Sequence, residues 1–360
     1  MLLFRCVKEM GVGLNKEIRT LLPKREQPGL IRPNFSCFGV IDDCMLRCKM
    51  CHKWREDLAI KDKEPADIPS WKRAMKSLRA IVDKGFFLHL GGGEALLLKD
   101  ILKLVRFGVN LGFTVNIPTN GYLIDKKMAK EIGQSGLTLM NLSLDSLDEK
   151  KHDFLRGVEG VYRRVMEAIE YLDRYAPKTR KGICTVIYDL NLDDILPLTR
   201  WVIENKALDW IDYMVVVQPN NTPPDPNWYK SEEFGFLWPK DSQKATAVID
   251  EIIRLKKEGQ SKIVNQICQL EAFKSYFQYP ERFVKKGSCN MDRAVHVSSI
   301  GDIFICYRWA KLGNIKEDDL AKVWYSKKAD KAREDIRRCQ DNCHFLLNCY
   351  FEGDYPFAVE

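Results

Sequence analysis

Three cysteines lie close together directly after residues 36–41, an apolar run that reads as a β-strand. Cys44, Cys48 and Cys51 have the spacing C-x3-C-x2-C. Thiolate ligands select zinc or iron–sulfur clusters among biological metals. A structural zinc site needs a fourth ligand, commonly from a second C-x2-C pair, and no such pair follows within the next thirty residues. A 4Fe–4S cluster normally takes four cysteines, so three would leave one iron open for chemistry, and structural zinc remains the alternative.

A run of glycines and a carboxylate, residues 91–94, directly follows a second expected strand at 86–90. Glycines at the end of a strand let the backbone approach a ligand closely. The carboxylate of Glu94 could accept hydrogen bonds from an ammonium group. A tight turn explains the glycines equally well. Polar residues also close the next two strands, at 119–121 and 143–145.

Together these motifs resemble the radical S-adenosylmethionine (radical SAM) superfamily. The resemblance implies that Cys44, Cys48 and Cys51 hold a 4Fe–4S cluster whose open iron binds the amino and carboxylate groups of SAM. Reductive cleavage of SAM would then release a 5′-deoxyadenosyl radical. The family's glycine–glycine–glutamate motif binds the amino group of SAM, and it corresponds here to Gly92, Gly93 and Glu94. The other SAM contacts that the resemblance implies are Met50, Asn120, Ser143, Asp145 and Arg156.

A second group of cysteines lies near the C-terminal end of the sequence. It comprises Cys289, Cys306, Cys339, Cys343 and Cys349. Residues 295–298 and 303–306 alternate like the strands of a hairpin. The group resembles the auxiliary-cluster domains called twitch and SPASM, and a full SPASM domain needs further cysteines after Cys349. We therefore expect a twitch-like domain with one auxiliary 4Fe–4S cluster. Cys289 and Cys306 are expected ligands, Cys343 and Cys349 are favoured over Cys339 to complete the set, and zinc is again the alternative.

The elements that must position these residues alternate between strand and helix. Expected strands lie at 36–41, 86–90, 114–118, 138–143, 181–187 and 211–217. Helical patterns separate them, which implies a parallel sheet with helices outside. With motifs at the ends of strands, the pattern predicts an α/β fold: a partial (βα)6 TIM-like barrel followed by a small α+β twitch-like auxiliary-cluster domain. We expect four parts: a basic extension with a helix over 1–22 (1–34), the radical SAM barrel (35–217), a helical bridging segment (218–285) and the auxiliary-cluster domain (286–360).

The composition limits the class of protein and its partners. The chain has 360 residues, a net charge of +7 and twelve cysteines. The absence of a secretory signal or of a long apolar stretch predicts a cytoplasmic chain without a membrane span. Nucleic-acid binding is not expected, because the sequence contains no basic run interleaved with aromatic residues. The positive charge suits an acidic electron donor of the flavodoxin or ferredoxin type. The remaining cysteines, Cys6, Cys37, Cys184 and Cys268, are expected to be small buried residues.

The sequence thus predicts a radical SAM enzyme, an oxidoreductase or other transforming enzyme, that abstracts a hydrogen atom from a small-molecule or peptide substrate. The auxiliary cluster would assist oxidation or anchor the substrate. The sequence does not identify a catalytic acid or base. The competing hypothesis is a cysteine-rich iron–sulfur electron carrier, or a zinc-binding module, without catalysis. Such a protein would not need a SAM-shaped pocket, Glu94 or Asp145.

Overall fold

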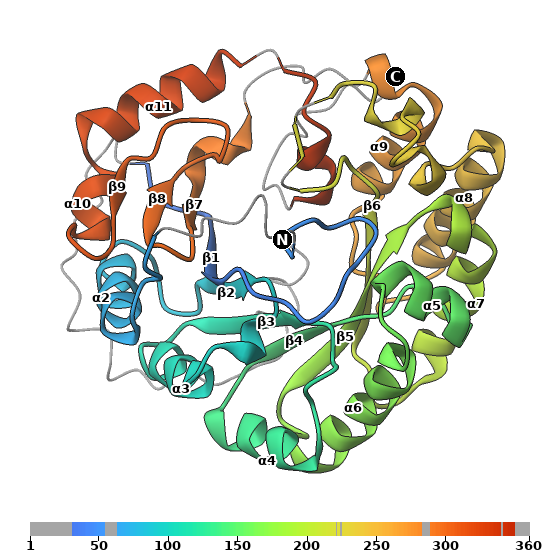
Figure 1. The fold of residues 1–360 in the computed structure, drawn as a ribbon, viewed down its shortest axis with the longest axis horizontal. Coiled ribbons are helices and arrows are strands. Elements are labelled where there is room, and N and C mark those ends of the chain that lie inside the picture. The colour runs from blue at the N-terminus through green and yellow to red at the C-terminus, as the bar shows by residue number, and fades with distance from the viewer. Residues whose placement is uncertain are drawn as a thin grey trace.

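A computed structural model of the chain describes residues 31–54, 63–220, 222–223, 225–282, 289–339 and 341–349. The helix expected over 1–22 and Cys6 lie outside the described residues. A curved sheet of parallel strands forms the centre of the molecule (Figure 1). These strands are β1 (Phe35–Ile41), β2 (Phe87–Gly92), β3 (Thr114–Thr119), β4 (Leu139–Ser143), β5 (Arg180–Ile187) and β6 (Trp210–Val215). All six expected strands are therefore confirmed, with small shifts of their ends.

Helices cover the outer face of this sheet (Figure 1). They are α2 (Ile68–Arg79), α3 (Ile101–Asn110), α4 (Lys126–Ser135), α5 (Glu149–Arg156), α6 (Val161–Tyr175) and α7 (Leu192–Glu204). Phe38 of β1 packs on Trp71 of α2 with ring centroids 5.6 Å apart, and both side chains are fully buried. Burying an apolar side chain of this size contributes about 2–3 kcal/mol. The core thus lies between strands and helices, and the other face of the sheet is left to form the site.

Two helix starts show how local sequence sets the elements. The sequence predicts a helix over 71–84 with Ser70 as its N-cap, but α2 begins at Ile68, and Asp67 caps it by accepting a hydrogen bond from the N–H of Ser70 (2.9 Å). Helix α5 was not expected from the sequence. It begins after Asp148, whose carboxylate accepts from the N–H of Lys151 (3.0 Å), and it ends at Gly157 with a φ of 72°. A left-handed residue at this position favours glycine.

The C-terminal part continues the same sheet. It comprises α8 (Ser242–Lys257), α9 (Ile267–Gln278), β7 (Ala294–Val297), β8 (Asp302–Phe304), β9 (Gly313–Asn314), α10 (Leu320–Trp324), α11 (Lys327–Arg337) and the 3-10 helix η9 (His344–Asn348). Strands β7 and β8 form the expected antiparallel hairpin. The sequence did not predict that β7 also pairs in parallel with β1. The strand order is therefore β6-β5-β4-β3-β2-β1-β7-β8-β9, and β1 has no open edge. The four-part division of the chain stays a prediction.

Side-chain amides cover the outer edge of β6, where an exposed strand would otherwise invite pairing with another chain. The carboxamide of Asn265 bonds to the main chain of Tyr213, and that of Asn348 bonds to the main chain of Val215. Asn348 belongs to η9, so the C-terminal cysteine region rests directly on the barrel. Within the described ranges, no helix is long and apolar enough to cross a membrane.

Candidate functional site

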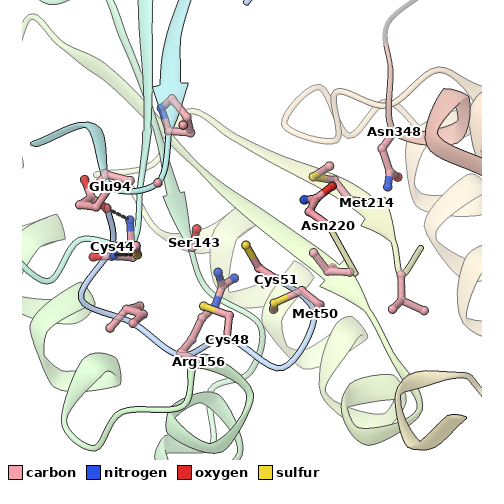
Figure 2. Close-up of a pocket in the computed structure, with 18 of the residues that line it drawn as sticks. Cys44, Cys48, Met50, Cys51, Glu94, Ser143, Arg156, Met214, Asn220 and Asn348 are labelled. Carbon is pink, nitrogen blue, oxygen red and sulfur yellow. Dashed lines mark hydrogen bonds between the residues drawn. The ribbon is translucent and has the colours of Figure 1, made fainter. Parts of the chain in front are cut away.

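A cavity of about 270 Å³ opens where the carboxyl ends of the strands meet the cysteine loop. Functional groups are expected at this rim of a parallel barrel. Figure 2 shows Cys44 and Glu94 on one side, Cys48 and Arg156 near the middle, and Met214, Asn220 and Asn348 on the other side. The residues that were singled out in the sequence and line the cavity are Cys44, Cys48, Met50, Cys51, Gly92, Gly93, Glu94, Asn120, Ser143 and Arg156. The fold therefore gathers motifs from the ends of four strands in one place.

The glycines at the end of β2 fasten the cysteine loop to the sheet. The N–H of Gly93 donates to the carbonyl of Ile41 (2.7 Å), and the N–H of Glu94 donates to that of Asp43 (2.9 Å). A Cβ atom at Gly92 would lie 2.0 Å from the carbonyl oxygen of Ile41, and one at Gly93 would lie 2.1 Å from that of Asp43. Glycine is required here because the chain's own backbone passes this closely. The sequence had suggested close approach of a ligand instead.

Helix α5 holds the cysteine loop from the opposite side. The N–H of Arg47 donates to the carbonyl of Arg156 (3.1 Å), and the N–H of Lys49 donates to that of Leu155 (2.9 Å). A Cβ atom at Gly157 would lie 2.1 Å from the carbonyl oxygen of Arg47. Further along the loop, Cys51 forms a parallel bridge with Asn220. The loop is thus attached on three sides, which fixes the positions of its thiols.

Glu94 is buried and held in place by three hydrogen bonds from the surrounding protein. Its carboxylate accepts hydrogen bonds from the hydroxyl of Thr119 (2.8 Å) and from the N–H groups of Asn120 (2.9 Å) and Leu96 (3.2 Å). Burial raises the pKa of Glu94, and these three hydrogen bonds partly offset the increase. Because a buried carboxylate needs a cation or further donors, this side of the cavity suits an ammonium group.

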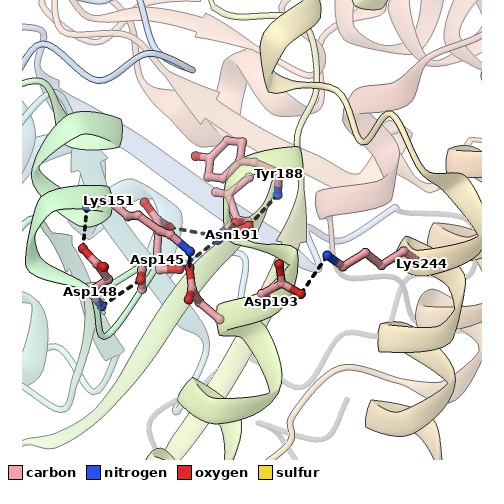
Figure 3. A network of polar contacts seen from close by, with 10 residues as sticks. Asp145, Asp148, Lys151, Tyr188, Asn191, Asp193 and Lys244 are labelled. Carbon is pink, nitrogen blue, oxygen red and sulfur yellow. Dashed lines mark hydrogen bonds and ion pairs between the residues drawn. The ribbon is translucent and has the colours of Figure 1, made fainter.

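Arg156 supplies the opposite charge. Its Nε atom lies 2.9 Å from an oxygen of Asp145, which is fully buried behind it. Burial alone would lower the pKa of Arg156, but the nearby negative charges, that of Asp145 first, outweigh this effect. The pKa is raised overall, and the guanidinium remains charged. Asp145 does not line the cavity. Its side chain accepts from the N–H of Val186 (3.1 Å), and its carbonyl accepts from the carboxamide of Asn191 (2.8 Å), within the network of Figure 3.

The remaining predicted contacts surround the thiols. The carboxamide nitrogen of Asn120 lies 3.8 Å from the sulfur of Cys44 and 3.3 Å from that of Met45. Ser143 is the last residue of β4 and lies opposite Cys184 of the neighbouring strand β5. Met50 lies in the loop between Cys48 and Cys51 and also faces the cavity. Asn120, Ser143 and Met50 therefore line the same cavity as the three thiols of the loop.

Sequence reasoning missed part of the lining. The missed residues are Leu46, Pro118, Thr119, Val186, Met214, Val215, Val216, Val217, Asn220 and Asn348. Most are apolar and lie within or at the end of an expected strand, where apolar residues are ordinary, so no local signal marked them as part of a site. Asn220 and Asn348 carried no such signal, because the first lies in a proline-rich loop and the second between two cysteines.

The C-terminal cysteines form a second group. Cys289 is buried, while the thiols at 306, 339, 343 and 349 are half-buried. Burial raises the pKa of the Cys349 thiol, and nearby Cys343, Cys289, Cys37 and Cys306 raise it further, in that order. These thiols therefore lie within one another's electrostatic field, although they come from separate parts of the chain.

The arrangement of thiols bears on the zinc alternative. In the part of the chain that the structure describes, no three His, Cys, Asp or Glu side chains are placed to hold a single metal ion. Cys44, Cys48 and Cys51 instead surround a cavity together with Glu94 and Arg156. This donor set fits a cluster larger than one ion, with a carboxylate and a guanidinium that complement the two charged ends of an amino acid. Separately, Cys268 is exposed, so the prediction that it is buried is wrong.

Two family models match the chain. Residues 39–202 match the radical SAM superfamily, and residues 289–350 match an iron–sulfur cluster-binding domain called SPASM. The first match covers the sheet from β1 to β5 with the helix that follows. The second covers the hairpin and all five C-terminal cysteines.

Curated relatives share parts of the chain. The AdoMet-dependent heme synthase of Methanosarcina barkeri is 23% identical over 258 residues, which cover 71% of this chain and 73% of that protein. The GTP 3′,8-cyclase of Thermodesulfovibrio yellowstonii is 32% identical over 188 residues, which cover 50% of this chain and 56% of the cyclase. The chain therefore spans only about half the length of the cyclase.

Solved structures share the fold. Streptococcus suis SuiB bound to the precursor peptide SuiA has a TM-score of 0.63 and 21% identity, with 89% of this chain and 70% of SuiB aligned. Native anSMEcpe with bound AdoMet has a TM-score of 0.61 and 18% identity, with 88% of each chain aligned. Both alignments extend over the barrel and the C-terminal region, so the combination of the two regions is shared.

Proposed function

Because the chain belongs to the radical SAM superfamily and carries a C-terminal iron–sulfur cluster-binding domain, we propose that it cleaves SAM reductively and removes a hydrogen atom from a small-molecule or peptide substrate. Its cofactors are SAM, a 4Fe–4S cluster and an auxiliary cluster. The observation that supports this function most strongly is the single cavity lined by Cys44, Cys48, Cys51, Glu94 and Arg156.

The cysteine loop provides the first cluster site. Cys44, Cys48 and Cys51 would hold three irons of a 4Fe–4S cluster and leave the fourth open. Bound together with SAM, this cluster supplies the electron that generates a 5′-deoxyadenosyl radical. The chain contributes a rigid loop, because Gly92 and Gly93 hold one side of it and α5 holds the other.

The charged residues of the cavity would orient SAM. We assign the ammonium group to Glu94, whose carboxylate is fixed by three hydrogen bonds. We assign the carboxylate to Arg156 and Ser143. Asp145 then acts as a positioning residue, because it contacts Arg156 and lies behind the cavity wall. Gly92, Gly93, Asn120 and Met50 would contact the rest of the molecule.

The C-terminal cysteines would hold the auxiliary cluster. We assign Cys289, Cys306, Cys343 and Cys349 as ligands, and we infer that Cys339 does not bind this cluster. This cluster would accept an electron from the substrate or anchor it. The relatives include a synthase and a cyclase, so the proposed reaction is not restricted to net oxidation of the substrate. An acidic flavodoxin or ferredoxin would serve as electron donor.

The alternative is an electron carrier or a zinc module without catalysis. It does not account for a buried Glu94 and a buried Arg156 beside the same thiols, since buried charges are costly without a role. The cavity therefore favours the enzyme.

An anaerobic assay tests the proposed function. Protein reconstituted with iron and sulfide is mixed with SAM and dithionite, and 5′-deoxyadenosine is measured together with iron per chain. We expect 5′-deoxyadenosine and about eight irons, as two 4Fe–4S clusters require. About four irons with activity would remove the auxiliary cluster from the proposal. Bound zinc, or iron without cleavage of SAM in fully reduced samples, would support the non-catalytic alternative.

A further inference from the structure

An exposed aromatic ring lies where α5 meets the cysteine loop. The side chain of Phe154 is 52% exposed, the largest value among the big apolar side chains of the described ranges. The carbonyl of the next residue, Leu155, accepts a hydrogen bond from the N–H of Lys49 in the loop (2.9 Å), so the ring lies at the side of the loop. Exposed apolar groups next to a functional site often mark a surface that binds a partner protein.

Cations of the loop cover this ring and a second one. The ammonium nitrogen of Lys49 lies 5.0 Å from the ring centroid of Phe154, and the guanidinium of Arg47 lies 5.4 Å from that of Trp54. Contacts of a cation with an aromatic face hold both side chains in place at a surface. Trp54 also donates its indole N–H to the carbonyl of Cys48 (3.4 Å). Both rings are therefore attached to the segment that carries Cys48, one of the expected cluster ligands.

The loop also separates this surface from the cavity that contains the thiols. Cys48 is buried and lines the cavity. Arg47 is exposed and Lys49 is half-buried, and neither they nor the two aromatic rings line the cavity. A partner on the outside of the loop would thus approach the cluster without occupying the place of SAM.

Three cations next to the rings have no carboxylate partner among the described residues. Arg47 and Lys49 belong to the loop, and Lys150 is exposed on α5, about one helical turn before Phe154. Residues four apart lie on the same face of a helix, so Lys150 and Phe154 share a face. Together with Trp54, these four residues form what we call the loop surface.

Carboxylates in the same region are mostly engaged by other groups. With their partners, the engaged carboxylates are Asp42 (Lys53), Glu149 (Arg163), Asp194 (Lys151), Asp148 (the N–H of Lys151) and Asp153 (the N–H groups of Gly160 and Tyr162). Two further carboxylates, Asp43 and Glu159, are exposed. The three unpaired cations outnumber these two carboxylates, and Lys49 places its positive charge at the ring of Phe154 itself. The loop surface therefore suits an acidic partner.

We propose that the loop surface docks an acidic flavodoxin, which delivers the electron to the cluster held by Cys44, Cys48 and Cys51. This inference rests on the proposed function and adds to it the place where the electron donor binds. One electron leaves the reduced flavin and enters the cluster, and no atom is transferred. The exposed edge of a flavin is aromatic and suits Phe154, whereas the 2Fe–2S cluster of a ferredoxin presents no ring. Redox encounters bury less than about 1,200 Å², so a small surface with one aromatic anchor is sufficient.

Anaerobic cleavage of SAM with two different reductants tests this inference. Flavodoxin, kept reduced by NADPH and flavodoxin reductase, needs the loop surface, whereas dithionite is a small ion and does not. We expect Lys49→Glu and Phe154→Ala each to lower kcat/KM for flavodoxin about tenfold, as the loss of a close charge or of an aromatic anchor predicts. With dithionite, both variants should form 5′-deoxyadenosine within about twofold of wild type. Wild-type rates with flavodoxin in both variants would overturn the proposal.

Matched variants outside the loop surface provide the controls. Lys127→Glu, at an exposed lysine of α4, changes the net charge of the chain as Lys49→Glu does, and Tyr279→Ala removes another ring that is 51% exposed. Both should keep the wild-type kcat/KM for flavodoxin. An equal loss in Lys127→Glu would mean that net charge governs the rate, and it would contradict the proposal. If Lys49→Glu loses activity with dithionite as well, Lys150→Glu on α5 decides the question, because it leaves the loop unchanged.

Binding of oxidised flavodoxin separates this inference from the proposed function, because it requires neither SAM nor electron transfer. We expect its Kd, measured by isothermal titration calorimetry, to rise about tenfold in Lys49→Glu and to rise with salt in the wild-type protein. Flavodoxin binding that depends on the loop surface, without SAM cleavage by dithionite, would contradict the function alone. SAM cleavage by dithionite without flavodoxin binding, or with a 2Fe–2S ferredoxin as the better donor, would contradict the docking proposal alone.

Discussion

The two cysteine regions differ in how the fold builds them. The N-terminal thiols lie within one short loop that is attached to β2, to α5 and to Asn220. The C-terminal thiols come from a hairpin, from the end of α11 and from η9, and the region rests on β6 through Asn348. The first site therefore has its geometry fixed locally. The second depends on tertiary packing of segments that are distant in sequence.

This difference agrees with a difference in chemistry. Glu94 and Arg156 place two opposite charges beside the N-terminal thiols, whereas the cavity beside Cys343 carries an ion pair between Arg308 and Asp341 and a further carboxylate, Asp225. We propose that the first region holds an amino acid against one cluster and that the second region holds the auxiliary cluster. The following changes would break or sharpen this division, in order of their expected effect on SAM cleavage.

Removal of a loop cysteine should have the largest effect. In Cys44→Ala the cluster loses one of three thiolate ligands, so we expect 5′-deoxyadenosine to fall below about 1% of the wild-type amount and iron to fall by about four per chain. The assay is the anaerobic reaction with SAM and dithionite. Cys268→Ala is the matched control, because Cys268 is exposed. Wild-type cleavage by Cys44→Ala would contradict the role of the loop.

A methyl group at Gly92 should displace the whole loop. Its Cβ would lie 2.0 Å from the carbonyl oxygen of Ile41, so Gly92→Ala should lower the free energy of unfolding by about 3 kcal/mol and reduce SAM cleavage strongly. Gly160→Ala is the control, since that residue also has a positive φ, 80°, but no atom within 4 Å of the added Cβ. It should cost about 1 kcal/mol through backbone strain alone. Similar losses in denaturant titrations of both variants would refute the contact as the cause.

Loss of the charge on Glu94 should weaken SAM without removing the cluster. We expect Glu94→Gln to raise the Kd of SAM by about tenfold to a hundredfold, as the loss of one charge-assisted hydrogen bond predicts. Iron content should not change. Glu149→Gln, at a surface ion pair with Arg163, should leave the Kd unchanged.

The pH dependence of SAM binding provides a second measurement on Glu94. Burial raises the pKa of Glu94 above its usual value of 4.5. As the pH falls through this raised pKa, the carboxylate becomes protonated and no longer attracts an ammonium group. The affinity of the wild-type protein should therefore decrease on acidification at a pH above 4.5, and that of Glu94→Gln should not show this step. Parallel pH profiles would exclude Glu94 as the ammonium partner.

Substitution in the C-terminal group should affect SAM cleavage least. Cys289→Ala and Cys306→Ala should each lose about four irons, as the loss of one 4Fe–4S cluster predicts, yet form 5′-deoxyadenosine within about twofold of wild type. Cys339→Ala should keep all of the iron, because we do not assign that thiol as a cluster ligand. Iron loss in Cys339→Ala with full iron in Cys349→Ala would reverse the assignment of the fourth ligand.

Much of the barrel could be predicted because its signals are local. Strand periodicity, turn residues and the spacing of the loop cysteines each depend on a few neighbouring residues, and the predicted strands agree closely with the structure. Helix α5 was missed because its eight residues are mostly polar and begin next to a turn. The pairing of β7 with β1 joins residues near 295 to residues near 36, and no local pattern reports such a contact.

The predicted site shows the same limit. Glu94 and Arg156 were found from motifs, but the position of Asp145 behind Arg156 depends on how β4 and α5 pack. The glycines at 92 and 93 suggested close contact with a ligand, whereas the atoms that exclude a side chain belong to Ile41 and Asp43. The role of Asn348 as a partner of Val215 could not be foreseen, because the two residues are separated by 133 positions.

Electron paramagnetic resonance of the reduced protein, with and without SAM, tests the division between the two regions most directly. It is measured on Cys289→Ala/Cys306→Ala, which should keep only the N-terminal cluster, and on Cys44→Ala/Cys48→Ala, which should keep only the auxiliary one. We predict that SAM changes the spectrum of the first variant and leaves that of the second unchanged. A SAM-dependent change in the second variant, or none in the first, would contradict the assignment of SAM to the loop between β1 and α2.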